Sequence, residues 1–125
     1  MLSELEAAAV LPARDLGRAK KFYREKLGLT PTEERDGELR FRGPGGSAVL
    51  IYETENAGTA KNTALLWVTD DVVAEVAKLR EAGVVFEEYD LPGLKTENGI
   101  ATTGQERAAW FKDSEGNILC VAQDA

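Results

Sequence analysis

Apolar and polar residues follow a pattern that occurs twice along the chain. The first occurrence begins with an apolar run at 5–13, which predicts a strand. Asp15 then precedes apolar residues at helical spacing as far as Leu27, and Gly28 follows them. This order predicts an N-cap, an amphipathic helix and a C-terminal glycine. The strands predicted after this helix lie at 30–35, 38–42 and 47–53.

The same order restarts after a small, polar segment at 55–62, which we interpret as a linker. A strand is predicted at 63–69, and Asp70-Asp71 precede a second amphipathic helix that ends at Gly83. Asp70 follows Asp15 by 55 residues, and Gly83 follows Gly28 by the same number. The strands predicted after this helix lie at 84–86, 108–112 and 118–122.

The offset between the halves grows toward the end of the chain. Phe111 and Gly116 follow Phe41 and Gly46 by 70 residues rather than 55. The extra residues fall in a Gly- and Thr-rich segment at 89–106, which we expect to be a long loop. We therefore predict a single α+β domain, in which two βαβββ modules form a curved mixed sheet around a cleft. The predicted parts are a first module at 5–54, the linker at 55–62 and a second module at 63–124.

Composition narrows the classes of function. The chain has 15 basic and 22 acidic residues, a formal charge of −7, which disfavours a nucleic-acid partner and mildly favours cationic ligands. No apolar run is long enough to span a membrane, and the single cysteine is typical of a cytoplasmic protein. The chain contains no histidine, so catalytic triads and histidine-based metal sites are absent.

Three segments at the start of the chain resemble the opening of a known family: Val10-Leu11-Pro12-Ala13-Arg14-Asp15-Leu16, Ala19-Lys20-Lys21-Phe22-Tyr23 and Leu27-Gly28-Leu29. This family is the glyoxalase/bleomycin-resistance/extradiol-dioxygenase group, also called the vicinal oxygen chelate superfamily. The segment 111–119 resembles its closing hairpin, with Ser114 where proline is usual. Asp70-Asp71-Val72 and the residues up to Phe86 resemble the start of its second module. The resemblance covers nearly the whole chain and implies the βαβββ fold, but it does not specify a reaction.

Enzymes of this family hold a divalent metal with four side chains, two from each module. The resemblance places these positions on Ala8, Leu50, Ala64 and Cys120. Three of these residues cannot bind a hard cation, and one thiolate does not replace a four-ligand site. We therefore predict that the chain has no metal site or cofactor and no metal-dependent isomerase or dioxygenase activity.

The resemblance implies that the four metal positions face the cleft, and strand alternation then predicts which other side chains face it. The candidate ligand-binding residues on the strands are Trp110, Tyr52, Arg40, Leu50, Leu66 and Cys120, and those in the long loop are Tyr89 and Leu94. Alternatives remain open for several of them. Trp110 can equally be a rim or dimer-interface residue, and Arg40 can pair with a neighbouring Glu. A single buried cysteine usually behaves as a small apolar residue, so we assign Cys120 no catalytic role.

Three functions are compatible with these residues. The first, which we favour, is a metal-independent protein that binds or sequesters a small, antibiotic-like molecule, as in the bleomycin-resistance branch. The second is an enzyme of the same family that works through a non-standard set of carboxylates. The third is a vestigial interaction or dimerisation module. Family members commonly form homodimers, so the resemblance also implies a homodimer.

Overall fold

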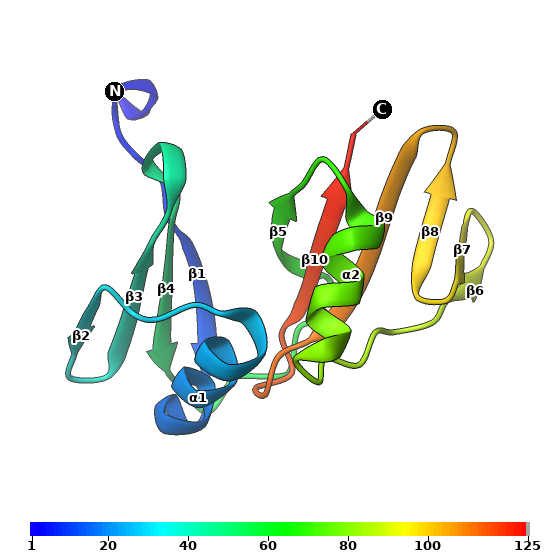
Figure 1. Ribbon diagram of the computed structural model, residues 1–125. Helices are drawn as coiled ribbons and strands as arrows, with labels where there is room; N and C mark the ends of the chain where they lie inside the picture. Colours follow the sequence, from blue (N-terminus) through cyan, green and yellow to red (C-terminus); the bar gives the residue numbers. More distant parts are fainter. Residues whose placement is uncertain (125) are drawn as a thin grey trace. The chain divides into compact units, whose positions relative to one another are not determined.

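The computed structural model describes residues 1–124 and contains two helices and two mixed sheets (Figure 1). The elements of the first sheet and its helix are β1 (Ala9–Ala13), α1 (Leu16–Leu27), β2 (Glu33–Arg35), β3 (Glu38–Arg42) and β4 (Ala48–Glu53). Two short 3₁₀ helices lie at Leu2–Glu4 and Pro44–Gly46. The strand order is β1-β4-β3-β2, and β1 runs parallel to β4.

The first helix begins and ends where its caps predict. The Asp15 carboxylate accepts the Arg18 N–H at 3.0 Å, and Gly28 adopts the left-handed conformation, with φ 70°, that ends the helix. Ala19 and Tyr23 are the buried residues of α1, and the Tyr23 ring lies 5.6 Å from that of Phe41 on β3. The helix thus covers one face of the sheet, whose buried residues include Leu11, Leu39 and Ile51.

The second sheet repeats this topology with two added strands. Its elements are β5 (Thr63–Val68), α2 (Val72–Glu81), β6 (Asp90–Leu91), β7 (Leu94–Glu97), β8 (Ile100–Thr103), β9 (Glu106–Lys112) and β10 (Ile118–Gln123). The strand order is β5-β10-β9-β8-β7-β6, and β5 runs parallel to β10 as β1 runs parallel to β4. The predicted α+β class with two βαβββ modules is therefore confirmed.

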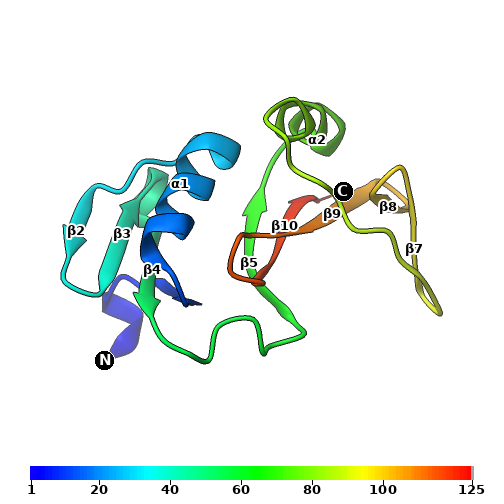
Figure 2. The same cartoon turned by 90° about the horizontal axis from the view of Figure 1, so that it is seen from below.

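The core of the second sheet lies on the face that α2 covers (Figure 2). Asp71 caps α2 by accepting the Ala74 N–H at 3.0 Å, and Val72 and Val76 are its buried residues. Below the helix, Phe111 of β9 packs edge-to-face on Phe86, with 5.4 Å between ring centroids. Among residues 61–113 and 118–124, no helix lies on the opposite face of the sheet (Figure 2).

Two segments differ from the sequence-based expectation. Residues 89–106, expected as one long loop, instead contain three short strands, β6, β7 and β8. Turns at Gly93 and Gly99 join them, and both glycines have φ 79°, a conformation that lets the chain reverse within a few residues. Residues 84–86, expected as a strand, contribute one isolated bridge between Phe86 and Phe111.

By its internal contacts the chain divides into two compact units. The first comprises residues 1–60 and 114–117, and the second comprises residues 61–113 and those from 118 onward. The turn between β9 and β10 therefore belongs to the first unit, although both strands belong to the second. Neither of the helices that the structure describes combines the length and the hydrophobicity needed to cross a bilayer.

Candidate functional site

The helix-free face of the second sheet carries an aromatic pair beside exposed apolar residues. Trp110 of β9 and Leu66 of β5 both lie opposite Cys120 of β10, so the three side chains share this face. Tyr89 packs edge-to-face on Trp110, with 5.7 Å between ring centroids and 82° between ring planes. Along β5, Leu66 is 48% exposed and Val68 is 69% exposed. Large apolar side chains exposed next to one another are typical of a binding surface.

Polar contacts hold the Trp110 ring and the backbone of Tyr89 in place. The Trp110 indole donates its Nε1–H to Thr63 Oγ1 at 3.1 Å, so the indole extends across β10 toward β5. The carbonyl oxygen of Trp110 accepts the Glu87 N–H at 2.8 Å, which holds the segment preceding Tyr89 against β9. Thr96 of β7 accepts the Tyr89 N–H through its hydroxyl at 2.7 Å. The aromatic pair is therefore a preformed surface.

Burial sets the chemistry of the two titratable groups at this surface. Cys120 is 1% exposed, and burial raises the pKa of its thiol to about 11, although a backbone hydrogen bond from Ala109 acts in the opposite direction. The thiol is therefore protonated and unreactive near neutral pH. Burial also raises the pKa of the Tyr89 hydroxyl, and the negative charge of Glu87 acts in the same direction.

The first sheet places three other predicted residues together on its own helix-free face. Leu50 of β4 lies between Val10 of β1 and Arg40 of β3, and Tyr52 follows two residues later on β4. Leu50, Arg40 and Ala8 line a hollow of about 170 Å³. The Arg40 guanidinium donates to Glu38 Oε1 at 3.0 and 3.1 Å, so it has the acidic neighbour that the sequence allowed.

The predicted ligand-binding residues thus fall into two groups. Leu66, Tyr89, Trp110 and Cys120 lie in the second unit, whereas Arg40, Leu50 and Tyr52 lie in the first. Leu94 is half-buried on β7, where it pairs with Leu91 of β6.

The residues at the family's metal positions do not fit a divalent cation. Ala8, Leu50 and Ala64 have no donor atom, and the Cys120 thiol is buried and protonated. Within residues 1–124, no three side chains among His, Cys, Asp and Glu are grouped so that they could hold a metal ion.

Two polar side chains of the second unit, those of Glu88 and Gln123, have local structural roles. Glu88 accepts the Gly99 N–H in the turn between β7 and β8. Gln123 accepts the Val72 N–H at 3.0 Å and so adds a hydrogen-bond partner at the start of α2.

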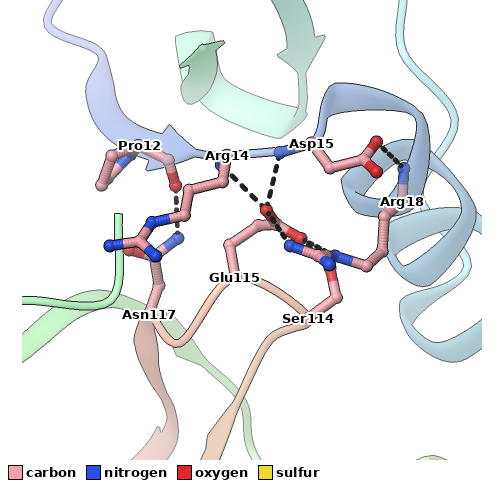
Figure 3. Close-up of polar contacts among 7 residues, drawn as sticks. All are labelled: Pro12, Arg14, Asp15, Arg18, Ser114, Glu115 and Asn117. Atoms are coloured by element: carbon pink, nitrogen blue, oxygen red, sulfur yellow. Dashed lines mark hydrogen bonds and ion pairs between the residues drawn. The ribbon is translucent and has the colours of Figure 1, made fainter. Parts of the chain in front are cut away.

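A carboxylate with several hydrogen-bond donors, that of Glu115, was not predicted from the sequence. Figure 3 shows Glu115, in the turn between β9 and β10, beside the start of α1. Its carboxylate accepts the N–H groups of Arg14 and Asp15 at 2.9 and 3.0 Å, and the Arg18 side chain at 2.7 and 3.0 Å. Ser114 donates its hydroxyl to the same carboxylate at 2.8 Å.

These hydrogen bonds determine the ionisation of Glu115. Burial by itself raises the pKa of the carboxyl, but the bonds from Arg18, Asp15, Ser114 and Arg14 outweigh it and lower the pKa from 4.5 to about 2. Only its position in a turn marks Glu115 in the sequence, because its charged partner lies 97 residues away.

The repeated topology and the helix-free sheet faces define the class of protein, namely a two-module βαβββ protein of the vicinal oxygen chelate type. The family model of the Glyoxalase/Bleomycin resistance protein/Dioxygenase superfamily matches residues 7–121. The chain belongs to this superfamily, as its sequence motifs indicated.

Solved structures of the same fold support this assignment. A glyoxalase/bleomycin resistance protein from Streptomyces sp. CB03234 is 26% identical, with a TM-score of 0.68 over 95% of this chain and 100% of that chain. TnmS3, an antibiotic binding protein from the same Streptomyces strain, is 25% identical, with a TM-score of 0.71 over 94% of this chain and 93% of that chain.

A third structure is similar in fold. It is a glyoxalase/bleomycin resistance protein from Catenulispora acidiphila DSM 44928, 23% identical, with a TM-score of 0.70 over 97% of this chain and 99% of that chain. Among curated proteins, none matches the chain significantly.

Proposed function

We propose that the protein binds a small, apolar, antibiotic-like molecule without a metal ion, on the helix-free face of the second sheet. The observation that carries this proposal is the Trp110–Tyr89 pair beside the exposed Leu66 and Val68, in which hydrogen bonds hold the Trp110 indole and the Tyr89 backbone. Aromatic rings favour stacking or edge contacts with other rings, so a ligand with a planar aromatic part suits this surface. Similarity to TnmS3, an antibiotic binding protein, supports an antibiotic-like ligand.

Charge narrows the ligand further. The formal charge of −7 attracts cations, so we favour a ligand that carries a positive group as well as its aromatic part. Binding of this kind needs affinity and no chemistry, which is compatible with a protonated Cys120 and with metal positions that lack donor atoms.

Tryptophan fluorescence tests the proposal, because the chain has two tryptophans, Trp67 and Trp110. We would titrate chelator-treated protein with a panel of bleomycin-type and other cationic, aromatic antibiotics. A ligand that binds at Trp110 is expected to quench the fluorescence of the Trp67→Phe variant, which retains Trp110. It is expected to leave the fluorescence of the Trp110→Phe variant unchanged. Replacing Trp110 by Ala removes the ring and is expected to weaken binding about tenfold, equivalent to about 1.4 kcal/mol.

A matched pair of valines provides the control. Val68 lies on the proposed surface, two residues after Leu66 on β5, whereas Val85 lies in the segment between α2 and β6, and both are well exposed, at 69% and 82%. Val68→Ala is expected to weaken binding, whereas Val85→Ala is expected to leave it unchanged. If Val68→Ala, Val85→Ala and Trp110→Ala all bound the ligand with the same affinity, the proposed surface would be refuted. Absence of binding by every member of the panel would refute the proposed ligand class.

The exposed apolar residues also suit a dimer interface, as the family resemblance implies. On the first sheet, Val10 is 56% exposed and Tyr52 is 42% exposed, both on the helix-free face. We propose a homodimer in which a second copy covers part of these surfaces. Light scattering after size exclusion should give twice the mass of 13.6 kDa, and Val10→Glu should shift the protein to the monomer mass. A monomer at all concentrations would refute the homodimer without affecting the ligand titration.

A further inference from the structure

A groove lies on the opposite side of the second sheet, beside α2. It encloses about 550 Å³, within the range of small-molecule sites. Val73 of α2 forms one wall, and the other lining side chains include Lys95, Glu97, Ile100, Thr102 and Arg107. The groove exists because α2 packs on β9 and β10, while β7 and β8 extend beyond the helix (Figure 1).

Strand register places the lining side chains on this face. Thr102 lies opposite Arg107, and Ile100 lies opposite Ala109, a buried residue of the face that α2 covers. Glu97 lies opposite Ile100, and Lys95 precedes Glu97 by two residues on β7, so both point to the same side. Trp110 follows Ala109 directly and therefore points to the other side of the sheet. The groove and the aromatic pair thus occupy opposite faces.

The outer wall of the groove is held by side-chain contacts. The turn between β7 and β8 contains Asn98, whose φ of 53° is unusual for a residue other than glycine. The Arg80 guanidinium donates to the Asn98 carbonyl oxygen and lies 5.5 Å from the Phe86 ring centroid. Glu88 accepts the next N–H, that of Gly99. A turn fixed from both sides keeps the groove open in the absence of a ligand.

The charges in the groove differ from those of the rest of the chain. Lys95 and Arg107 are cations, and neither forms an ion pair with any residue in the range 1–124. Glu97 is the single carboxylate among the lining residues, and Asp90 lies opposite Lys95 on the neighbouring strand. The cross-strand neighbours of Arg107, Thr102 and Gln123, are not acidic, so its guanidinium is the group best placed to pair with an anion.

We propose that this groove binds a small monocarboxylate with a short apolar body. The carboxylate pairs with Arg107 and Lys95, and the Thr102 hydroxyl supplies a further donor. The apolar body lies against Val73 and Ile100. A dianion suits the groove less well, because Glu97 repels a second negative charge. This site is independent of the antibiotic-like ligand proposed for the other face.

Two-dimensional NMR of ¹⁵N-labelled full-length protein with pentanoate tests the proposal. Pentanoate is expected to shift the amide signals of residues 95–107 in a saturable way, whereas 1-pentanol at equal concentration is expected to shift them little. Arg107→Gln is expected to weaken pentanoate binding about tenfold, because one charge-assisted hydrogen bond is lost. Glu97→Gln is expected to strengthen it several-fold, because a repulsive charge is removed.

Lys112→Gln is the matched control, because Lys112 lies on β9 with Arg107 but outside the groove. It removes one exposed positive charge from the same strand and should leave the affinity unchanged. Equal weakening by Lys112→Gln and Arg107→Gln would overturn the proposal, since attraction would then be unspecific. Binding of 1-pentanol as tight as that of pentanoate would also overturn the proposal. Weaker binding of pentanoate by Glu97→Gln would do the same. Because two variants change the affinity in opposite directions, loss of folding cannot imitate the expected result.

Discussion

Replacing Glu115 by Gln tests whether a buried carboxylate stabilises the first unit. The substitution keeps the size of the side chain and removes its charge. The wild-type side chain is 0% exposed and pairs with Arg18, whose side chain is 53% exposed. Arg18 can therefore be hydrated when its partner is neutral. The expected cost arises mainly from the lost hydrogen bonds of the carboxylate, four of which come from Arg18 and the N–H groups of Arg14 and Asp15.

The pKa of Glu115 gives the magnitude of the expected loss in the free energy of unfolding. Its fall from 4.5 to about 2 corresponds to about 3 kcal/mol of preferential stabilisation of the charged form in the folded protein. We therefore expect Glu115→Gln to lower the free energy of unfolding at pH 7 by about 3 kcal/mol. This is a large fraction of the roughly 5–15 kcal/mol that stabilises a typical domain.

The pH dependence follows from the direction of the shift. The folded-state pKa lies below the unfolded value, so the unfolded chain takes up the proton first as the pH falls. The contribution of Glu115 is fully present above about pH 5 and is lost as the pH falls toward 2. The stability difference between the wild type and Glu115→Gln should therefore be constant from pH 7 to about 5 and shrink below it.

Urea unfolding at a series of pH values measures this difference, and hydrogen exchange localises it. The Arg14 and Asp15 amides donate to Glu115, so they should exchange faster in the variant.

Glu33→Gln is the matched control for this series. The Glu33 carboxylate accepts Arg35 Nε at 2.6 Å, close to the 2.7 Å of the Arg18 contact, but its side chain is 44% exposed. We expect little change in the urea midpoint, because solvent screens an exposed pair. If both variants were destabilised equally, or if the difference for Glu115→Gln did not depend on pH, the hydrogen bonds to the ionised, buried carboxylate would not be the source of the stabilisation.

Three further predictions address other parts of the fold. The Cys120 thiol, with its pKa raised to about 11, should react with an aromatic disulfide at pH 8 about 100-fold more slowly than the unfolded chain, and equal rates would show that the thiol is accessible. Gly116→Ala should cost at least about 2 kcal/mol in urea unfolding, because φ is 87° and an added Cβ would lie 2.9 Å from a backbone atom. Gly93→Ala, with φ 79° and no atom within 4 Å, should cost only about 1 kcal/mol, and the reverse order would contradict the contact. Asp71→Ala removes the acceptor for the Ala74 N–H and should cost about 1 kcal/mol in urea unfolding followed by circular dichroism, and an unchanged midpoint would show that this cap does not stabilise the protein.

The sequence by itself determined the local elements and their repetition. Asp15 and Asp71 mark the helix starts, and Gly28 marks the end of α1, because caps act within one turn of a helix. The two-residue period of a strand, counted from the family's metal positions, indicated which side chains share a face, and the motifs in their repeated order indicated the family. These signals are local, so they can be read without knowing which strands pair.

The tertiary structure decided features that depend on distant partners. The pairing of Glu115 with Arg18 joins residues 97 positions apart, and no local pattern specifies it. The burial of Cys120 depends on its position in β10 between two neighbouring strands. The groove beside α2 depends on how far β7 and β8 extend beyond the helix, and the segment that forms them resembled a loop in sequence. Each of these features depends on desolvation and on contacts that exist only after the strands have paired, so no local sequence pattern specifies it.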